Sequence, residues 1–263
     1  MKWSDEAEAA IKKAPFFVRK KIRARVEKEA MEAGRTTITM EDVSATRNRF
    51  LTTMKDEVRG FQLDTCFGAG GCPNTIMDSQ PLVEKIETIL MEADLKHFLL
   101  NTVDGPLKFH HEFRVTLAEC PNACSQPQIK DVGIIAAASP EITDNPCTLC
   151  GACEEICEEL AITLDMDQKK PVISRTACVS CGKCINACPA SVLKINKNGF
   201  RILLGGKLGR HPVLAHELPG IFNQEEVLAI LKKCLKFYKE RSKGGRRFSE
   251  LLAEAPDFLT SVL

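Results

Sequence analysis

The sequence predicts an α+β protein made of several separate segments, and three patterns support this fold class. Apolar residues recur at helical spacing near the N-terminus, as in Ile22, Val26 and Ala30. Runs with the alternating or continuously apolar character of strands lie in the middle of the chain, at 111–118 and 132–138. A cysteine-rich segment after them repeats itself with an offset of 31 residues. The length of 263 residues allows one large domain or two to three small ones.

Composition excludes several classes of protein. Lys plus Arg number 36 and Asp plus Glu number 35, so no overall basic field favours nucleic acid as a partner. No apolar run approaches the length of a membrane span, and the first residues lack the order of a signal peptide. We therefore expect a cytoplasmic protein. Thirteen cysteines in a reducing compartment indicate metal ligands rather than disulfides.

The first 45 residues predict a small helical domain. A short amphipathic helix is expected over 3–13 and ends before Pro15, because proline does not continue a helix. A second helix is expected over 16–33. Thr39, with Asp42 three residues later, is typical of a helix start, so a third helix follows.

Two longer helices complete the predicted scaffold. The first covers 80–93, with its apolar residues on one side. The second begins at Asn223, whose side chain can form a capping box with Glu226, and runs to about residue 241. Cys234 lies among the apolar residues of this helix, so we interpret it as a core residue rather than a ligand.

Eight cysteines form two copies of the spacing C-x2-C-x2-C-x3-C. The two copies are Cys147, Cys150, Cys153 and Cys157, followed by Cys178, Cys181, Cys184 and Cys188. Three thiolates from one tight loop can bind three corners of a cubane, while the fourth is carried away on a short helix. Zinc knuckles and disulfides are the alternatives, and zinc sites rarely use such a run.

This repeat resembles the bacterial two-cluster [4Fe-4S] ferredoxins over about residues 145–196. The resemblance implies a ferredoxin-like domain at 141–196 with crossed ligation. Cys188 would then complete the cluster of the first copy, and Cys157 would complete the cluster of the second copy.

Four further cysteines come earlier in two pairs. They are Cys66, Cys72, Cys120 and Cys124. Four thiolates brought together by folding are enough for another [4Fe-4S] cluster, with a zinc site as the alternative. The glycine-rich loop 68–71 leaves the backbone free of side chains, as expected beside something bulky.

The second of these pairs, written Cys-Pro-Asn-x-Cys, resembles the sirohaem-binding half of the sulfite and nitrite reductase family. Residues 202–212 are similar to the Gly-Gly-x-x-Gly-x-x-Pro stretch of that family. The insertion of the cysteine repeat between 131–135 and this stretch resembles the dissimilatory sulfite reductase subunits. The resemblance covers about 60–230 and implies a sulfite reductase-like α/β lobe formed by 60–140 and 197–240.

The family resemblance implies three [4Fe-4S] clusters and one sirohaem. Cys124 would share its thiolate between a cluster iron and the sirohaem iron. The implied sirohaem-site residues are Asn122, Cys124, Gly205, Gly206, Lys207 and Arg210, of which Cys124, Lys207 and Arg210 would serve catalysis. Lys130 and Arg114 are further candidates, because sirohaem carries carboxylates that need cationic partners.

Full enzymes of that family carry a sandwich lobe before the cysteine-bearing lobe, and this lobe supplies much of the cationic set that holds sulfite. Here helices take its place, and 3–43 resemble the small C-terminal helical domain found in one of the subunits of light-independent protochlorophyllide reductase. We interpret this domain as a docking or dimerisation module. Four cations ahead of the first cysteine pair could replace the missing set; they are Arg47, Arg49, Lys55 and Arg59.

The predicted function is a sirohaem- and [4Fe-4S]-dependent oxidoreductase that reduces a small oxyanion, sulfite or nitrite, through its own ferredoxin clusters. An iron–sulfur electron-transfer subunit without sirohaem and a non-catalytic sirohaem-binding protein are the alternatives. Expected partners are the anion, a redox donor protein, and a second copy or another subunit that completes the site. Residues 241–263 are expected to form a basic tail, and 232–247 a solvated face or a landing site for an acidic donor.

Overall fold

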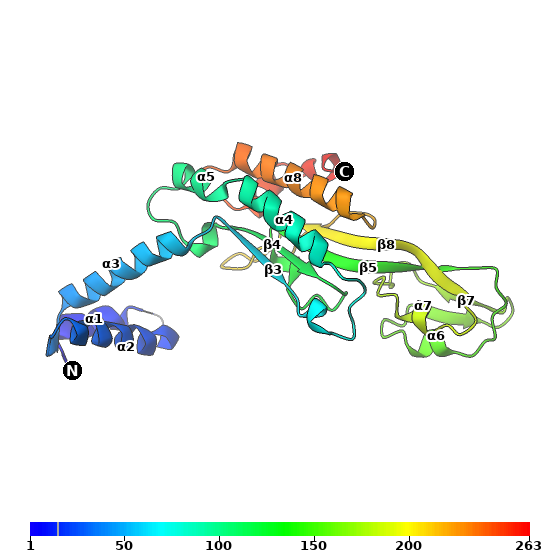
Figure 1. The fold of residues 1–263 in the computed structure, drawn as a ribbon, viewed down its shortest axis with the longest axis horizontal. Helices are drawn as coiled ribbons and strands as arrows, with labels where there is room; N and C mark the ends of the chain where they lie inside the picture. The colour runs from blue at the N-terminus through cyan, green and yellow to red at the C-terminus, as the bar shows by residue number, and fades with distance from the viewer. Residues whose placement is uncertain (15) are drawn as a thin grey trace. The chain divides into compact units, whose positions relative to one another are not determined.

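The computed structural model describes residues 1–14 and 16–263, with the side chains of 16–18, 50–56 and 69 left out (Figure 1). The helix-ending role expected for Pro15 and the side chain of Lys55 therefore lie outside the described residues. Two compact units are present. The smaller unit consists of 1–59 and 104–110, and the larger of 60–103 and 111–263.

The smaller unit contains three helices and a two-stranded parallel sheet. They are β1 (Lys2–Trp3), α1 (Asp5–Lys12), α2 (Phe16–Glu32), β2 (Thr37–Ile38) and α3 (Met40–Glu57). The helix start predicted at Thr39 is confirmed, because the Thr39 N–H donates to Asp42 Oδ2 at 2.9 Å. Ala7, Val26 and Ile38 are buried together as its core.

The larger unit is built on a mixed five-stranded sheet with the order β3-β4-β5-β8-β9. The strands are β3 (Phe61–Thr65), β4 (Phe113–Ala118), β5 (Val132–Ile142), β8 (Leu193–Leu204) and β9 (His216–Glu217). The first three run parallel, and β8 is antiparallel to both of its neighbours. Residues 132–138 are all buried, which explains their continuously apolar character.

Helices cover one face of this sheet (Figure 1). They are α4 (Gln80–Glu92), α5 (Leu95–Thr102), α8 (Gln224–Arg241), α9 (Phe248–Glu254) and α10 (Phe258–Ser261). Alternate strand residues such as Val115, Ile134 and Ile202 pack with the helices in the main core. Cys234 is completely buried there, which confirms it as a core residue, and this burial raises the pKa of its thiol.

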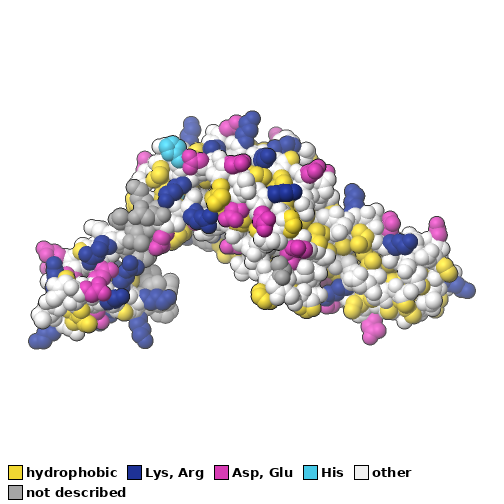
Figure 2. All heavy atoms as spheres, viewed as in Figure 1, with side chains coloured by type: hydrophobic (Ala, Val, Ile, Leu, Met, Phe, Trp, Pro, Cys, Tyr) yellow, Lys and Arg dark blue, Asp and Glu magenta, His cyan; other side chains and the backbone are white. Residues whose placement is uncertain are grey.

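The C-terminal segment is not a solvated basic tail, which corrects the expectation for 241–263. Phe248, Leu251 and Leu252 of α9 are buried in the main core. The expectation rested on the number of basic residues and neglected the helical spacing of these three apolar residues. On the face drawn in Figure 2, cationic and anionic side chains are interspersed over the helices of the larger unit.

Strands β5 and β8 extend past the sheet and carry a cysteine-rich insert at their far end (Figure 1). Their pairing runs from Val132 opposite Leu204 to Ile142 opposite Leu193, with a bulge after Ser139. The insert contains α6 (Ala152–Glu155), β6 (Ile162–Asp165), β7 (Lys170–Ile173) and α7 (Lys183–Ala187). In the part of the chain that the structure describes, no helix has the length and apolar character needed to cross a membrane.

Candidate iron–sulfur centres

The two cysteine loops of the insert repeat each other in backbone conformation as well as in sequence. Three pairs of residues, each 31 positions apart, share a positive φ: Leu149 (56°) with Ser180 (57°), Gly151 (79°) with Gly182 (73°), and Leu160 (50°) with Ser191 (52°). Residues other than glycine rarely adopt this region, so its recurrence at matching positions is specific. Each loop is therefore bent in the same way around the space that its cysteines face.

Backbone amides donate hydrogen bonds to the thiol groups at the end of each repeat. The Ala161 N–H reaches Cys157 Sγ, and the Val192 N–H reaches Cys188 Sγ, both at 3.3 Å. Hydrogen bonds of this kind stabilise a thiolate, which is the form that ligates metal. The loops are thus arranged to hold negatively charged sulfur.

The structure brings the eight insert cysteines together in two crossed sets. The first insert set, Cys147, Cys150, Cys153 and Cys188, lines one small cavity. Burial raises the pKa of the Cys153 thiol, and the charges of Cys188 and Cys147 raise it further.

The second insert set is Cys178, Cys181, Cys184 and Cys157. Burial raises the pKa of Cys184 to about 12, with further contributions from the charges of the other three members. Each set combines three cysteines of one copy with the last cysteine of the other. Ligation of a cluster by either set stays a prediction.

The four earlier cysteines, which we call the strand-end set, follow the C-terminal ends of two parallel strands. Cys66 comes directly after β3, and Cys120 comes two residues after β4. Because β3 and β4 pair in parallel with Thr65 opposite Leu117, these two cysteines leave the sheet side by side. The Glu119 N–H also donates to Cys66 Sγ at 3.2 Å.

The other two members approach Cys120 through loops. Burial raises the pKa of the Cys120 thiol, and the charges of Cys66, Cys124 and Cys72 add to this effect, whereas a hydrogen bond from the Asn122 backbone opposes it. Cys124 is exposed, unlike Cys120. Its sulfur therefore has room for a second bound group.

The described residues contain no three Cys, His, Asp or Glu side chains that converge on one metal ion. A single ion such as zinc needs ligands that surround one centre. The thiolates of a cubane bind different irons and stand farther apart. A buried polar atom also fits a cluster at the strand-end set. Thr75, which lines the same cleft as Cys120, has a buried Oγ1 with no hydrogen-bond partner among the described residues.

Close contacts and a turn within the protein explain why glycines occur near the strand-end set. A Cβ on Gly68 would lie 2.2 Å from a carboxylate oxygen of Glu119, and one on Gly70 would lie 2.7 Å from the Phe67 ring. Gly71 has a φ of 102°, which favours glycine. The loop is therefore glycine-rich because neighbouring side chains and its own turn require it.

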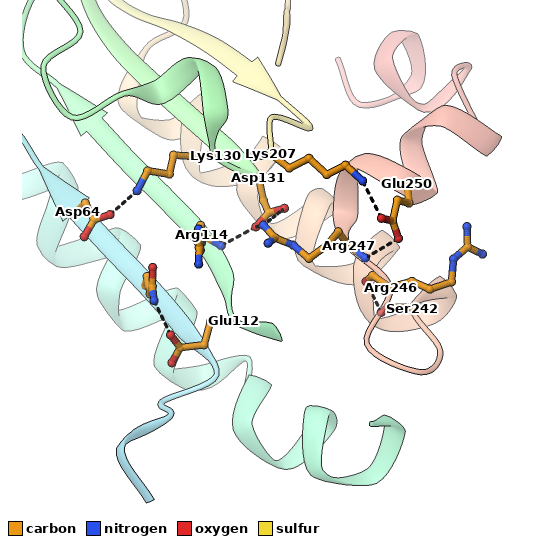
Figure 3. A network of polar contacts seen from close by, with 11 residues as sticks. Asp64, Glu112, Arg114, Lys130, Asp131, Lys207, Ser242, Arg246, Arg247 and Glu250 are labelled. Atoms are coloured by element: carbon orange, nitrogen blue, oxygen red, sulfur yellow. Dashed lines mark hydrogen bonds and ion pairs between the residues drawn. The ribbon is translucent and has the colours of Figure 1, made fainter. Parts of the chain in front are cut away.

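Two of the cations expected at a sirohaem site are engaged in ion pairs (Figure 3). Lys130 Nζ lies 2.6 Å from Asp64 Oδ2, and Lys207 Nζ lies 2.7 Å from Glu250 Oε1. Both lysine side chains are only 14% exposed. The bond from Lys207 lowers the pKa of Glu250 below its usual range. These pairs neutralise the two lysines as the structure stands.

The remaining sequence candidates have different surroundings. Arg210 is exposed, in the loop that follows β8. Gly205 and Gly206 donate backbone hydrogen bonds to the carbonyls of Asp131 and Lys130, and a Cβ on Gly206 would lie 2.4 Å from the Gln128 oxygen. In the smaller unit, Arg49 pairs with Glu29 at 2.6 Å.

The sequence alone did not predict a buried ion pair that lies close to Lys130 and Lys207 (Figure 3). Arg247 Nη2 lies 2.9 Å from Asp131 Oδ2, and the Asp131 side chain is 1% exposed (Figure 3). The Arg114 backbone N–H also donates to Asp131 at 2.8 Å. Burial raises the pKa of Asp131, and the Arg247 charge opposes this rise. No local signal joins residues 131 and 247, so only the fold reveals the pair.

A polar cleft lies between the strand-end set and the second insert set. Its lining includes Thr75, Cys120 and Asn122 on one side, and Cys157, Cys181 and Lys183 on the other. The insert is fastened beside this cleft, because the Ala138 N–H of β5 donates to the Ser180 carbonyl at 2.7 Å. Arg201 of β8 also donates to the Val179 carbonyl at 3.3 Å. The first insert set does not line the cleft.

Comparison with known proteins gives two family matches. The family described as the nitrite and sulphite reductase 4Fe-4S domain matches residues 58–255. The family described as the proto-chlorophyllide reductase 57 kD subunit matches residues 3–47. A subunit of the light-independent protochlorophyllide reductase of Chlorobium limicola is 56% identical over 41 residues, which are 16% of this chain and 8% of that protein.

Similar proteins of greater overlap include two from Methanocaldococcus jannaschii. Coenzyme F420-dependent sulfite reductase is 28% identical over 182 residues, and an uncharacterized protein is 30% identical over 183 residues. The matches take in 69% and 70% of this chain, but only 27% and 58% of those relatives. The crystal structure of dissimilatory sulfite reductase I aligns with a TM-score of 0.50 at 16% identity, covering 82% of this chain and 56% of that one. The fold is therefore shared with that structure.

Proposed function

Because the chain belongs to the nitrite and sulphite reductase 4Fe-4S domain family, we propose that it is an oxidoreductase that reduces a small oxyanion, sulfite or nitrite, with sirohaem and [4Fe-4S] clusters. The observation that carries the proposal is the strand-end set. Its four cysteines lie within the matched region; Cys66 and Cys120 follow the ends of β3 and β4, and Cys72 and Cys124 come close enough for their charges to act on Cys120.

Three clusters are proposed, one for each cysteine set. The strand-end set would hold one cluster, and the first and second insert sets would hold the two clusters of a ferredoxin-like insert. Sirohaem, when bound, supplies an iron with an open coordination position at which the anion accepts electrons. The exposed sulfur of Cys124 suits a thiolate that serves both this group and a cluster.

Electrons would reach the strand-end set by way of the insert. The second insert set borders the cleft that also exposes Cys120, whereas the first insert set does not. In the proposed order, the cysteines of the first insert set would hold the cluster that accepts electrons from an external donor, and those of the second insert set would hold the cluster nearest the cleft. The hydrogen bond from Ala138 to Ser180 would keep the last step short.

The chain's cations would bind and orient the anionic groups. Arg210 is exposed on the loop after β8 and can donate hydrogen bonds to a carboxylate or an oxyanion. Lys207 would first have to exchange Glu250 for such a group, since the two form an ion pair at 2.7 Å. A lysine released in this way can hold a proton near the reacting anion.

The ion pairs also favour a second candidate function. Lys130 and Lys207 are neutralised by Asp64 and Glu250, so neither offers a free positive charge to a cofactor with many carboxylates. An iron–sulfur electron-transfer subunit without sirohaem would not need these cations, and a sirohaem-binding protein without catalysis would need none for the anion. A second copy or another subunit could instead supply the missing cations to an active enzyme.

Anaerobic purification followed by spectroscopy and kinetics tests these candidates. The proposal expects about twelve cluster irons, four for each cubane, together with the visible bands of sirohaem. It also expects sulfite or nitrite reduction with an artificial donor. Cys124→Ser should lose or decouple the sirohaem while the insert clusters remain, and Cys234→Ala serves as the control for a cysteine outside the sets.

The outcomes separate the candidates. Clusters without sirohaem would favour the electron-transfer subunit. Loaded protein that reduces neither anion would favour the non-catalytic binder. Zinc in place of iron at the strand-end set would overturn the proposal.

A further inference from the structure

We propose that Lys183 raises the reduction potential of the cluster held by the second insert set, and so makes that cluster the better electron acceptor within the insert. The inference rests on the proposed function for the presence of the clusters. It adds the residue that distinguishes two otherwise matching sites.

Lys183 stands at the start of α7, between two cysteines of the second insert set. Its Nζ lies 2.6 Å from Glu158 Oε1, and Glu158 directly follows Cys157, the fourth member of the same set. Both residues of this ion pair line the cleft that contains Cys120. The pair is therefore next to one cluster site and faces the other side of the cleft.

The charge of the lysine prevails over that of its partner at this place. The Lys183 side chain is 33% exposed and the Glu158 side chain is 74% exposed, so solvent screens the carboxylate more strongly. An ammonium group held in an ion pair carries its charge at neutral pH. A fixed positive charge stabilises the reduced cluster, which is the more negative state.

The first insert set has no equivalent of this pair. Subtracting 31 from 183 gives Ala152, and adding 31 to 158 gives Pro189, so both counterparts are uncharged. The first copy instead carries Glu154 and Glu155 on α6, where the second copy has Ile185 and Asn186.

The difference between Lys183 and Ala152 favours reduction at the second insert set, and the more exposed Glu158 opposes this effect only in part. Glu154 and Glu155 lie between Cys153 of the first set and Cys157 of the second, so their charges distinguish the two sets less than the lysine does. The electron is then drawn toward the cluster that borders the cleft. The repeat thus keeps the same ligands and backbone in both copies, and it changes the charge around them.

Redox titration of the anaerobically purified full chain, followed by electron paramagnetic resonance of each cluster, tests this inference. Lys183→Gln should lower the midpoint potential of the second insert cluster. A tenfold change in the ratio of oxidised to reduced cluster at fixed potential corresponds to ~59 mV for a one-electron couple. Lys183→Arg, which keeps the charge, should restore the original value.

The decisive result is the direction in which Glu158→Gln shifts the midpoint potential of the second insert cluster. Loss of the carboxylate leaves Lys183 uncompensated, so the potential should rise, by less than the fall in Lys183→Gln because Glu158 is more exposed. A merely structural ion pair would give both variants a shift of the same direction. Such a result, or no shift in either variant, would overturn the inference.

Two further variants keep the test independent of folding at position 183. Ala152→Lys places the same charge beside the first insert set and should raise the potential of that cluster alone. Lys236→Gln removes an equal charge from the exposed face of α8 and should move neither cluster. Absence of insert clusters from the wild type would refute the proposed function and this inference together. Clusters whose potentials stay unchanged in Lys183→Gln and Ala152→Lys would refute this inference only.

Discussion

The insert and the strand-end set bring cysteines together by different means. In the insert, positive φ angles at matching positions bend two short loops, and nearby amides bond the thiols. The strand-end set instead depends on the parallel register of β3 and β4, which the helices of the main core support. The difference teaches that the insert sites depend on local conformation, whereas the strand-end site depends on the whole sheet.

The strongest test of this comparison asks whether the two cysteine sets of the insert are crossed. Cys157→Ser alters the first copy of the motif but should abolish the cluster of the second insert set completely. Electron paramagnetic resonance and iron content of anaerobic protein measure the loss. Cys181→Ser should remove the same signal and Cys188→Ser the other one. Loss of the same signal in Cys181→Ser and Cys188→Ser, with the other signal lost in Cys157→Ser, would contradict the crossed sets.

A core substitution under the sheet should affect the strand-end set first. Phe113 is buried, with its ring 5.1 Å from that of Tyr238 and 5.4 Å from that of Phe248. Phe113→Ala should lower the free energy of unfolding by about 3–5 kcal/mol. In urea, followed by cluster absorbance and circular dichroism, the strand-end cluster should disappear before the insert clusters.

The matching control is a substitution in the hydrophobic core of the insert. Ile162 is buried there beside Cys153, so Ile162→Ala should weaken the insert clusters and leave the strand-end cluster in place. Simultaneous loss of all clusters in both variants would show that the two regions unfold as one.

The buried pair of Asp131 and Arg247 couples the sheet to the C-terminal helices. Arg247→Met leaves the Asp131 carboxylate buried without its cation, which should cost about 3 kcal/mol or more at pH 7. Burial already raises the pKa of Asp131, and loss of the arginine raises it further.

The sign of the pH effect follows from that rise. When the folded pKa of a carboxyl group is above its unfolded value, the folded state binds more protons, so stability increases as the pH falls through the window between them. The variant should therefore recover stability relative to the wild type as the pH falls below 7, measured by urea unfolding at each pH. A deficit that grows on acidification would contradict this assignment.

The smallest effect is expected at the start of α8, whose capping residues line neither of the cavities bordered by the cysteine sets. Asn223 Oδ1 accepts the Glu226 N–H at 3.0 Å, and Glu226 Oε2 accepts the Asn223 N–H at 2.8 Å. Asn223→Ala should cost about 1 kcal/mol, seen as a lower melting temperature with unchanged cluster spectra. Glu225→Ala, one position away and outside the capping box, should have a smaller effect.

Local patterns in the sequence predicted the parts of the fold that neighbouring residues determine. The capping box of Asn223 is confirmed, as is the helix start at Thr39. Cys234 is buried as predicted from its apolar neighbours. The repeat of 31 residues also recurs in the backbone angles, because the same short motif imposes the same turns.

Features that depend on distant residues escaped prediction. Lys207 and Glu250 meet only because α9 packs beside the loop that follows β8, and Asp131 meets Arg247 for the same reason. Net charge along the C-terminal segment suggested a tail, although Phe248 and Leu251 belong to the core. The side of the insert that faces the cleft follows from the bond between Ala138 and Ser180, which no motif encodes.

The β5–β8 pair has a consequence for how such a chain gains or loses its insert. Its strands end side by side, with Ile142 opposite Leu193, so the two ends of the insert are attached at neighbouring positions. Replacing 143–192 by a tight turn would leave a continuous hairpin, with only a modest change in the entropy of closing the loop. A module attached in this way can be exchanged between proteins without redesigning the parent sheet. A new module would sit beside the same cleft if it re-established the contacts that Ala138, Pro140 and Arg201 make with the insert.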